Sequence, residues 1–381
     1  MCDPNNPNIQ NRTTPQWSLH YSACNAGLSW THLASRQAFY RHRIIPRTCV
    51  DTNQRDTATE IFGHRVDAPI GFAPIGINRI YHPAGELSVA KVAEELKLTY
   101  CLSSAGSYSI EEVGKANGDG PRFVQLYQSH DDDQAISMMQ RALDNGFDVC
   151  MLMTDTWSLA WHHNDFFTGN YAFYHDHGAG DLGLKDPVFQ QRLKEAGINE
   201  KQNPMEFGAK WIDKNIWYGR AHTWEKVKWT MAQWKRISGG RSFCIKCIQN
   251  VEDAKKCVEL YEFDGILVTN HAGRQVDGAV ASLDVLEKIA DAIMFDSCVR
   301  SAADVFKALA LGAKYVFISR LWVWALSISR EHGVRHMLKS LLAEFDLLME
   351  EAGYPFIDRI DGSAIDSLPQ AANLIAEHSG I

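Results

Sequence analysis

The sequence repeats one pattern, in which a short apolar run is followed by a stretch with apolar residues at helical spacing. Eight runs have the length and composition of buried strands, at residues 70–73, 100–103, 123–127, 149–153, 243–246, 265–269, 293–295 and 315–319. Helical spacing occurs between them at residues 85–96, 133–143, 251–260 and 283–293. Eight strands that alternate with helices favour an α/β fold, and a (β/α)8 TIM barrel rather than an open sheet.

The organisation of the chain follows from this alternation. We expect one barrel domain over residues 17–381, preceded by a polar tail at residues 1–16. The region 166–223 interrupts the alternation after the fourth strand, and it is aromatic and polar. Long loops in compact domains are usually functional or disordered, so this insertion either caps the barrel mouth as a lid or extends into solvent. A helical stretch at residues 333–352 is expected to serve packing.

Charge and apolar patterning exclude several classes of protein. The formal net charge of -8 argues against a nucleic-acid partner. The chain has no run of about 20 apolar residues, no block of Lys and Arg, and no signal-peptide core within residues 1–16. We therefore expect no membrane partner. Because the last residues are not the usual peroxisomal address, we expect a cytoplasmic protein.

The distribution of cysteines also fits a cytoplasmic protein. The nine cysteines are scattered, which fits a reducing compartment. Cys244 and Cys247 have CxxC spacing, but residues three apart on a strand face opposite sides. We therefore expect no metal site.

A histidine and an arginine follow the sixth predicted strand, within the segment TNHAGRQVD at residues 269–277. The His271 imidazole can take a proton near neutral pH. The Arg274 guanidinium can hold a carboxylate through two hydrogen bonds. Alone, this spacing is more often structural than functional. In a TIM barrel, however, the carboxyl ends of the strands carry the active site, and the pair stands at such an end.

Other predicted strands also end in polar residues. Lys246 ends the fifth strand, and a lysine inside a barrel mouth is costly unless it is paired with an anionic group. Asp155 follows the fourth strand and Asp296 follows the seventh. Loops after the last two strands often hold a phosphate in this fold, and Arg320 begins the last one.

With these residues the chain resembles the FMN-dependent 2-hydroxy acid oxidases and dehydrogenases, a family that includes glycolate oxidase and lactate oxidase. The family segment around its base reads S-N-H-G-[GA]-R-Q-x-D, close to TNHAGRQVD here. Further matches lie at residues 84–87, 102–104, 125–127, 154–157 and 307–313. The resemblance covers residues 22–353. The segments 155–157 and 338–346 and the long insertion are most similar to the lactate 2-monooxygenase branch.

The resemblance implies a role for each matching residue. His271 would be the base, Asp155 would hold its imidazolium, and Tyr127 would contact the substrate. Arg274 would bind the substrate carboxylate, and Tyr21 would assist it. Lys246 would stabilise the anionic reduced flavin. The residues implied for FMN binding are Ala73, Pro74, Ile75, Ser103 or Ser104, Gln125, Lys246, Asp296, Arg300, Ser319 and Arg320.

Several positions depart from the family pattern. His162 stands where the family has a second carboxylate-binding arginine, so the resemblance places it among the substrate-binding residues. A histidine pairs with a carboxylate only when charged, and losing the arginine would weaken the binding of a small acid by about 1.5–3 kcal/mol. Cys298 and Ser319 replace glycines at the phosphate side, and Met153 replaces a threonine that contacts flavin. Only a polar tail is expected before Tyr21. The connection into the seventh strand is short, which implies a shortened helix or a strained barrel.

Three functions follow from these expectations. The first is FMN-dependent oxidation of a 2-hydroxy acid with O2 as electron acceptor, with oxidative decarboxylation as a further outcome. The second is a repurposed tailoring enzyme that acts on a larger substrate than lactate. The third is a non-catalytic barrel that has lost its flavin. The partners implied are a small-molecule acid, O2 and further copies of the chain, as a tetramer by family analogy.

Overall fold

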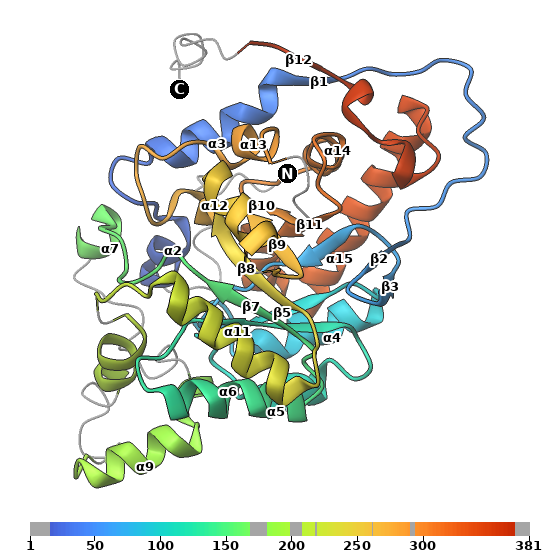
Figure 1. Ribbon diagram of the computed structural model, residues 1–381. Coiled ribbons are helices and arrows are strands. Elements are labelled where there is room, and N and C mark those ends of the chain that lie inside the picture. Colours follow the sequence, from blue (N-terminus) through green and yellow to red (C-terminus); the bar gives the residue numbers. More distant parts are fainter. Residues whose placement is uncertain are drawn as a thin grey trace.

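The computed structural model describes residues 16–167, 181–198, 208–217, 219–260, 262–289 and 294–369. Its centre is a closed barrel of eight parallel strands (Figure 1). The strands follow the chain around the barrel, and β11 closes it by pairing with β4. They are β4 (Ile70–Phe72), β5 (Tyr100–Ser103), β6 (Arg122–Leu126), β7 (Val149–Met153), β8 (Phe243–Ile248), β9 (Gly265–Val268), β10 (Met294–Asp296) and β11 (Tyr315–Ile318). The predicted TIM barrel, with all eight predicted strands, is confirmed.

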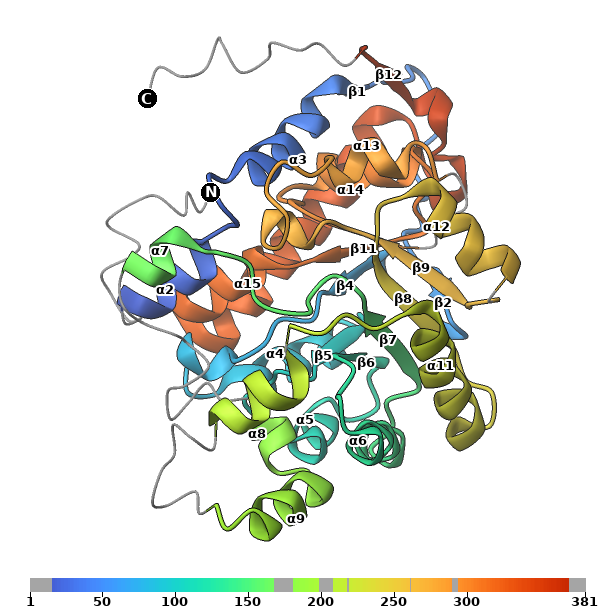
Figure 2. The ribbon, with the colours of Figure 1, turned by 60° about the vertical axis from the view of Figure 1, so that its left-hand side comes forward.

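Helices follow the strands and cover the outside of the barrel (Figures 1 and 2). They are α4 (Gly85–Glu95), α5 (Ile110–Ala116), α6 (Asp132–Asp144), α11 (Trp224–Ser238), α12 (Val251–Lys255) with the π-helical turn η4 (Lys256–Leu260), α13 (Ser282–Leu286), α14 (Ala302–Ala310) and α15 (Arg320–Ala352). Local sequence fixes several helix starts. The Ser109 side chain accepts from the backbone N–H of Glu112 in a capping box, and the Asp131 side chain caps α6.

The barrel is filled with side chains and closed at one end. Nearly every strand residue is buried, as expected when helices cover the outside of a parallel sheet. A hairpin of β2 (Thr59–Ile61) and β3 (His64–Val66) packs into the interior, and its Phe62 ring lies 5.8 Å from that of Phe123. A Cβ on Gly265, the first residue of β9, would lie 2.8 Å from the Phe62 ring. The hairpin therefore covers the end of the barrel where the strands begin. A binding site can open only at the other end, where the strands finish.

Outside the barrel, a short antiparallel ladder joins an amino-terminal segment of the chain to a carboxyl-terminal one. After α2 (Gln16–Ala23) and α3 (Trp30–Arg41), β1 (His42–Ile44) pairs with β12 (Ile365–Ser367). Short 3-10 turns occur at η1 (Asn78–Ile80), η5 (His271–Gly273), η6 (Ile357–Arg359) and η7 (Gly362–Ala364). The expectation of only a polar tail before Tyr21 is wrong from Gln16 onward, because that residue begins α2. The rest of the tail lies outside the described residues.

The insertion after β7 contains several short helices. These are α7 (His163–Phe167), α8 (Asp181–Leu184), α9 (Pro187–Glu195) and the π-helical turn η3 (Lys210–Ile216). In Figure 2, α8 and α9 extend past the outer side of α5 and α6. Other parts of the predicted lid at 166–223 lie outside the described residues.

Two predicted helices have different bounds in the structure. The helix expected at 283–293 is α13, which ends at Leu286, so the helix before the seventh strand is short. The helix expected at 333–352 begins earlier, at Arg320, and α15 is kinked at Ser329 and Arg330. Among the described residues, no helix has both the length and the apolar character needed to cross a membrane.

Candidate active site

The loop after β9 places His271 against Asp155. The His271 Nδ1 atom lies 3.2 Å from each carboxylate oxygen of Asp155, which follows β7. Asp155 also accepts a hydrogen bond from Thr156 Oγ1 at 2.7 Å, and its backbone carbonyl accepts one from Gln275 Nε2. Since Nδ1 is engaged with the carboxylate, the Nε2 atom of His271 is the nitrogen left to act as a base.

Burial and charge set the protonation of this pair. Burial lowers the pKa of His271, and the Asp155 carboxylate only partly opposes that shift. Burial by itself would raise the pKa of Asp155, but His271 and Lys246 outweigh it and hold that pKa well below its ordinary value. At neutral pH the pair is therefore a carboxylate beside a neutral imidazole, which is the state that a general base requires.

The lowered pKa of His271 predicts how turnover depends on pH. Protonation removes the base, and the pKa of His271 lies below its ordinary 6.5, so activity persists to lower pH than a solvent-exposed histidine would allow. We expect the acid limb of kcat/KM to fall below pH 6.5. A pH profile of kcat/KM checks this, and a limb above that value would contradict the assignment. In Asp155→Asn the limb moves to still lower pH, because the group that raises the pKa of His271 is gone.

The turn that carries His271 is conformationally demanding. His271, Ala272 and Gly273 have φ values of 56°, 54° and 78°, in the left-handed region that non-glycine residues rarely adopt. At Gly273 a Cβ would also lie 2.6 Å from the backbone nitrogen of His32 in α3. The turn is therefore held by close packing against the amino-terminal helix.

Gly273→Ala is expected to destabilise the protein by about 2 kcal/mol more than Gly278→Ala. Gly278 is a matched control because its φ of 80° is similar, while a Cβ added there would meet nothing within 4 Å. The strain of positive φ is then common to both variants, and the difference reports the contact with His32. Thermal unfolding of both variants measures it. Equal losses of stability would show that α3 does not hold this turn.

Lys246 is buried at the centre of the barrel mouth. Only 2% of it is exposed, and its Nζ atom lies 3.6 Å from Cys247 Sγ. Burial opposes its charge, yet Cys247, Asp296 and Asp155 together raise the pKa of Lys246, so it stays an ammonium. Cys247 comes at a β-bulge with a φ of 77°. Both CxxC cysteines are free thiols.

Arg274 lies at the edge of the same mouth, beside Tyr21. Its Nη1 atom donates to the backbone carbonyls of Tyr21 at 3.0 Å and Cys24 at 2.7 Å, and its guanidinium lies 4.9 Å from the centre of the Tyr21 ring. His162 is 3% exposed, and both of its ring nitrogens have partners. Its Nε2 atom lies 2.8 Å from the Arg274 carbonyl and its Nδ1 atom 3.1 Å from Asp165 Oδ2. His162 thus holds the Arg274 backbone, and neither nitrogen is free for a carboxylate.

A cavity opens at the carboxyl end of the barrel. Its walls include most of the residues expected from the sequence, namely Tyr21, Ala73, Pro74, Ile75, Ser103, Tyr127, His162, Lys246, His271, Arg274, Asp296, Ser319 and Arg320. Ser104 does not line it, because its hydroxyl accepts the backbone N–H of Tyr127.

Two buried polar atoms fit the expected flavin. Among the described residues, Gln125 Nε2 and Asp296 Oδ1 have no hydrogen-bond partner. The Ser103 hydroxyl donates to Gln125 Oε1 at 3.0 Å, so the Oε1 atom of this amide is paired while Nε2 is not. Each unpaired buried group costs about 1–3 kcal/mol. Asp296 lines the cavity, so a polar ligand there would be stabilised by it, whereas Gln125 does not line the cavity. Burial also raises the pKa of Asp296.

The phosphate side is rich in positive charge. Arg320 is bonded to Asn25 Oδ1 at 3.1 Å and to the Ala272 carbonyl at 3.2 Å, and its Nη2 atom lies 3.0 Å from His32 Nδ1. Burial, Arg320 and Arg300 lower the pKa of His32 to about 3, so the ring is neutral. The Arg300 side chain is exposed and does not line the cavity. This accumulation of guanidinium groups suits an anion.

Of the two positions where a glycine is replaced, only Cys298 has a backbone that favours glycine. Cys298 and its neighbour Ser297 have φ values of 57° and 140°, whereas Ser319 has a φ of -121°. The Ser297 hydroxyl is fixed by Thr269 and Ser282 at 3.0 Å each. Cys298 is buried, and its backbone carbonyl accepts from Arg36 at 2.8 Å. Side-chain contacts therefore hold the loop in the shape that glycine would adopt freely.

Several lining residues were not expected from the sequence. Tyr81, Leu159 and Trp217 line the cavity, and the Trp217 ring meets that of Tyr127 edge-on at 5.2 Å. Trp217 follows η3 in the insertion, so its position depends on the path of a long loop that no periodic pattern predicts. His32 lies on α3, in a region to which no element had been assigned. The apolar and aromatic residues near the amino terminus were the available sequence signal for this helix.

Comparisons with known proteins identify the family of this chain. The FMN-dependent dehydrogenase family matches residues 10–367. An FMN-dependent alpha-hydroxy acid dehydrogenase from Penicillium citrinum is 37% identical over 330 residues, which cover 85% of this chain and 80% of that protein. An L-lactate oxidase from Lysinibacillus sphaericus is 31% identical over 350 residues, with 90% and 87% covered.

A solved structure of mandelate oxidase with (S)-mandelic acid superposes with a TM-score of 0.79 at 26% identity, and covers 96% of this chain and 97% of that one. The family match spans most of the chain, and the expected family and its FMN cofactor are confirmed. The chain belongs to the FMN-dependent dehydrogenase family of 2-hydroxy acid oxidoreductases.

Proposed function

We propose that this chain oxidises a 2-hydroxy acid with a bulky, aromatic side chain, with O2 as the final electron acceptor. The supporting observation is the wall of the cavity around His271. Tyr21, Tyr81, Tyr127 and Trp217 line it together with Leu159. Such a wall gains stabilisation from an aromatic group and little from glycolate or lactate. The engagement of His162 inside the protein also argues against a site built on two charged contacts to a small acid.

The chemistry divides between the cofactor and the protein. Bound FMN supplies the acceptor for the α-hydrogen and its electron pair. The other hydrogen of the substrate leaves as a proton, which His271 takes on Nε2. Asp155 lies 3.2 Å from Nδ1 and stabilises the imidazolium that forms. Oxidation thus removes two electrons and two hydrogens from the substrate, and the protein carries only the proton.

The remaining charged groups hold the reactants. Arg274 pairs with the substrate carboxylate, while the carbonyls of Tyr21 and Cys24 fix the orientation of its guanidinium. The ammonium of Lys246 would stabilise negative charge on bound FMN. Gln125 and Asp296 would hold the flavin, since each has an unpaired polar atom, and Arg320 would hold its phosphate. Tyr127 contacts the substrate from the wall that it shares with Trp217.

A substrate panel tests the proposed function. We expect kcat/KM for mandelate to exceed that for glycolate by at least about tenfold, because the extra apolar contacts act in the bound state. Oxygen consumption with each acid measures this, and analysis of the products separates a 2-oxo acid from the shorter acid of oxidative decarboxylation. Preference for glycolate would contradict the proposed substrate class. Turnover with a dye but not with O2 would contradict the proposed acceptor.

A further inference from the structure

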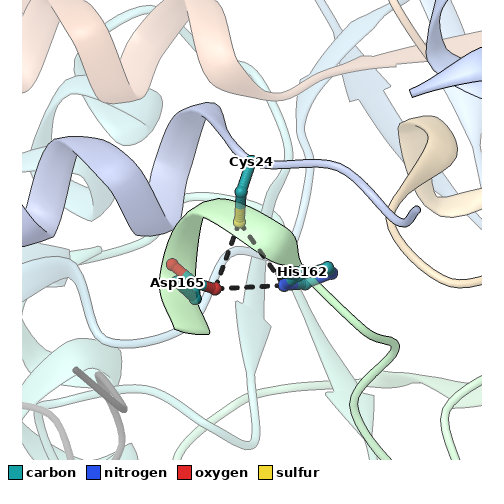
Figure 3. A group of neighbouring side chains, drawn as sticks. All are labelled: Cys24, His162 and Asp165. Atoms are coloured by element: carbon teal, nitrogen blue, oxygen red, sulfur yellow. Dashed lines mark hydrogen bonds and ion pairs between the residues drawn. The ribbon is translucent and has the colours of Figure 1, made fainter. Parts of the chain in front are cut away.

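A second cluster of chemically reactive side chains lies behind Arg274, outside the cavity chemistry described above. It consists of Cys24, just after α2, together with His162 and Asp165 at the start of α7 (Figure 3). All three side chains point toward one another. The Cys24 Sγ atom lies 3.4 Å from His162 Nδ1 and 3.2 Å from Asp165 Oδ2, and those two atoms are 3.1 Å apart.

We propose that Cys24, His162 and Asp165 bind a divalent transition-metal ion, and that zinc is the ion that suits them. Thiolate, imidazole and carboxylate are the three ligand types of protein zinc sites. With bonds of about 2.0–2.3 Å and tetrahedral angles, neighbouring ligand atoms lie roughly 3.3–3.6 Å apart. The three distances here are close to that range, so a metal ion fits between these atoms with small adjustments.

The hydrogen bond on the far side of His162 supports metal binding. Its Nε2 atom lies 2.8 Å from the backbone carbonyl of Arg274, which can only accept, so Nε2 carries a proton. A neutral ring then presents the lone pair of Nδ1 toward Cys24 and Asp165. Histidines that bind metals commonly donate their other N–H to a backbone carbonyl in this way.

The charges of the cluster also match a divalent ion. Cys24 is 1% exposed and His162 is 3% exposed, so an uncompensated charge here would be costly. One thiolate and one carboxylate neutralise a divalent cation, and the thiol proton leaves for solvent when the ion binds. The guanidinium of Arg274, 3.8 Å from the sulfur, then acts as a donor to the thiolate. Three protein ligands leave a fourth position for water or an anion.

A different group of three ligand types, Asp155, Cys247 and His271, fits a metal ion less well. The ammonium of Lys246 lies 3.6 Å from the Cys247 sulfur, and His271 must keep a free nitrogen to act as the base. Metal binding there would oppose the catalytic role, whereas of the residues in the Cys24 cluster only His162 lines the cavity. The ion would join the end of α2 to the start of α7, and would fix Arg274 through the His162 and Cys24 contacts.

The test is the zinc content of the flavin-loaded protein after exposure to zinc chloride and gel filtration, measured by elemental analysis. The wild-type protein is expected to retain one zinc ion per chain. Cys24→Ser and Asp165→Asn are expected to weaken zinc affinity at least about 100-fold, measured by calorimetry with zinc chloride. Zinc-edge absorption spectroscopy should show one sulfur neighbour. These measurements need no substrate, so they stand apart from the proposed function.

Matched variants keep the test decisive. Cys247→Ser and the exposed Cys49→Ser should retain the ion, because neither thiol belongs to the cluster. Flavin content and thermal unfolding of each variant establish that it is folded, and zinc should raise the melting temperature of the wild type but not of Cys24→Ser. A wild type that retains no zinc would overturn the proposal and leave a hydrogen-bonded clamp on Arg274. Retention in Cys24→Ser with loss in Cys247→Ser would place the ion beside His271 and would also overturn it.

Discussion

Replacement of His271 with glutamine is expected to lower kcat by about 10²–10⁴-fold, the range that a general base contributes. Glutamine is close in size, but it cannot take a proton near neutral pH. The loss should appear in kcat and in kcat/KM, because proton removal occurs in the chemical step rather than in binding. Anaerobic flavin reduction followed by absorbance measures the step directly.

The control for this prediction is the retained flavin. His271 comes from a strained turn, so the variant must still bind FMN with an unchanged absorbance spectrum before its rate is interpreted. Asp155→Asn should also slow flavin reduction, because its contact with Nδ1 holds the imidazole in place. Flavin reduction in His271→Gln at the wild-type rate would remove His271 from the mechanism.

The second large effect is expected at Arg274. Arg274→Met should lower kcat/KM for a 2-hydroxy acid by about 10–150-fold, which corresponds to the 1.5–3 kcal/mol of a hydrogen bond to a charged group. Arg274→Lys should recover only part of this loss, because an ammonium cannot make the planar two-point contact. Steady-state kinetics of the three proteins measure the losses.

An uncharged substrate provides the control for Arg274. The amide of the same hydroxy acid lacks the carboxylate, so its kcat/KM should change little between the wild type and Arg274→Met. A similar loss for the acid and the amide would mean that the substitution acts through Tyr21 and Cys24, whose carbonyls the guanidinium also holds. In that case Arg274 would be a structural residue rather than the carboxylate contact.

The strand pattern was the most informative feature for the fold. A parallel strand with helices outside and packed side chains inside is apolar on both faces, so each strand is visible as a short apolar run. Even the three-residue β10 could be predicted from its position in the alternation. The start of α15 at Arg320 could not, because this helix follows β11 directly and has no separate start signal.

Some residues of the candidate site could also be predicted from the sequence, and others could not. His271, Arg274 and Asp155 follow strands, and Lys246 lies near the end of β8. The barrel brings strand ends together, so sequence position implied that these residues lie close to one another. Trp217 comes from the long insertion, whose path depends on tertiary contacts rather than on a repeat.

The sequence predicted that His162 lies at the site, but it did not predict what the side chain contacts there. Its contact with the Arg274 carbonyl joins residues 112 positions apart, and the orientation of its ring is set by Asp165 and Cys24. No local pattern encodes such a contact. A position that suggested a carboxylate-binding residue is, in the structure, a support for the neighbouring arginine.

We propose that the mouth of this barrel holds FMN and that the protein oxidises a bulky 2-hydroxy acid. The decisive experiment mixes the FMN-loaded protein with (S)-mandelate in the absence of oxygen and records the flavin absorbance. The oxidised flavin bands should bleach and should return when oxygen is admitted. A protein that takes up no FMN, or whose bound flavin stays oxidised with mandelate and with every smaller 2-hydroxy acid, would contradict it.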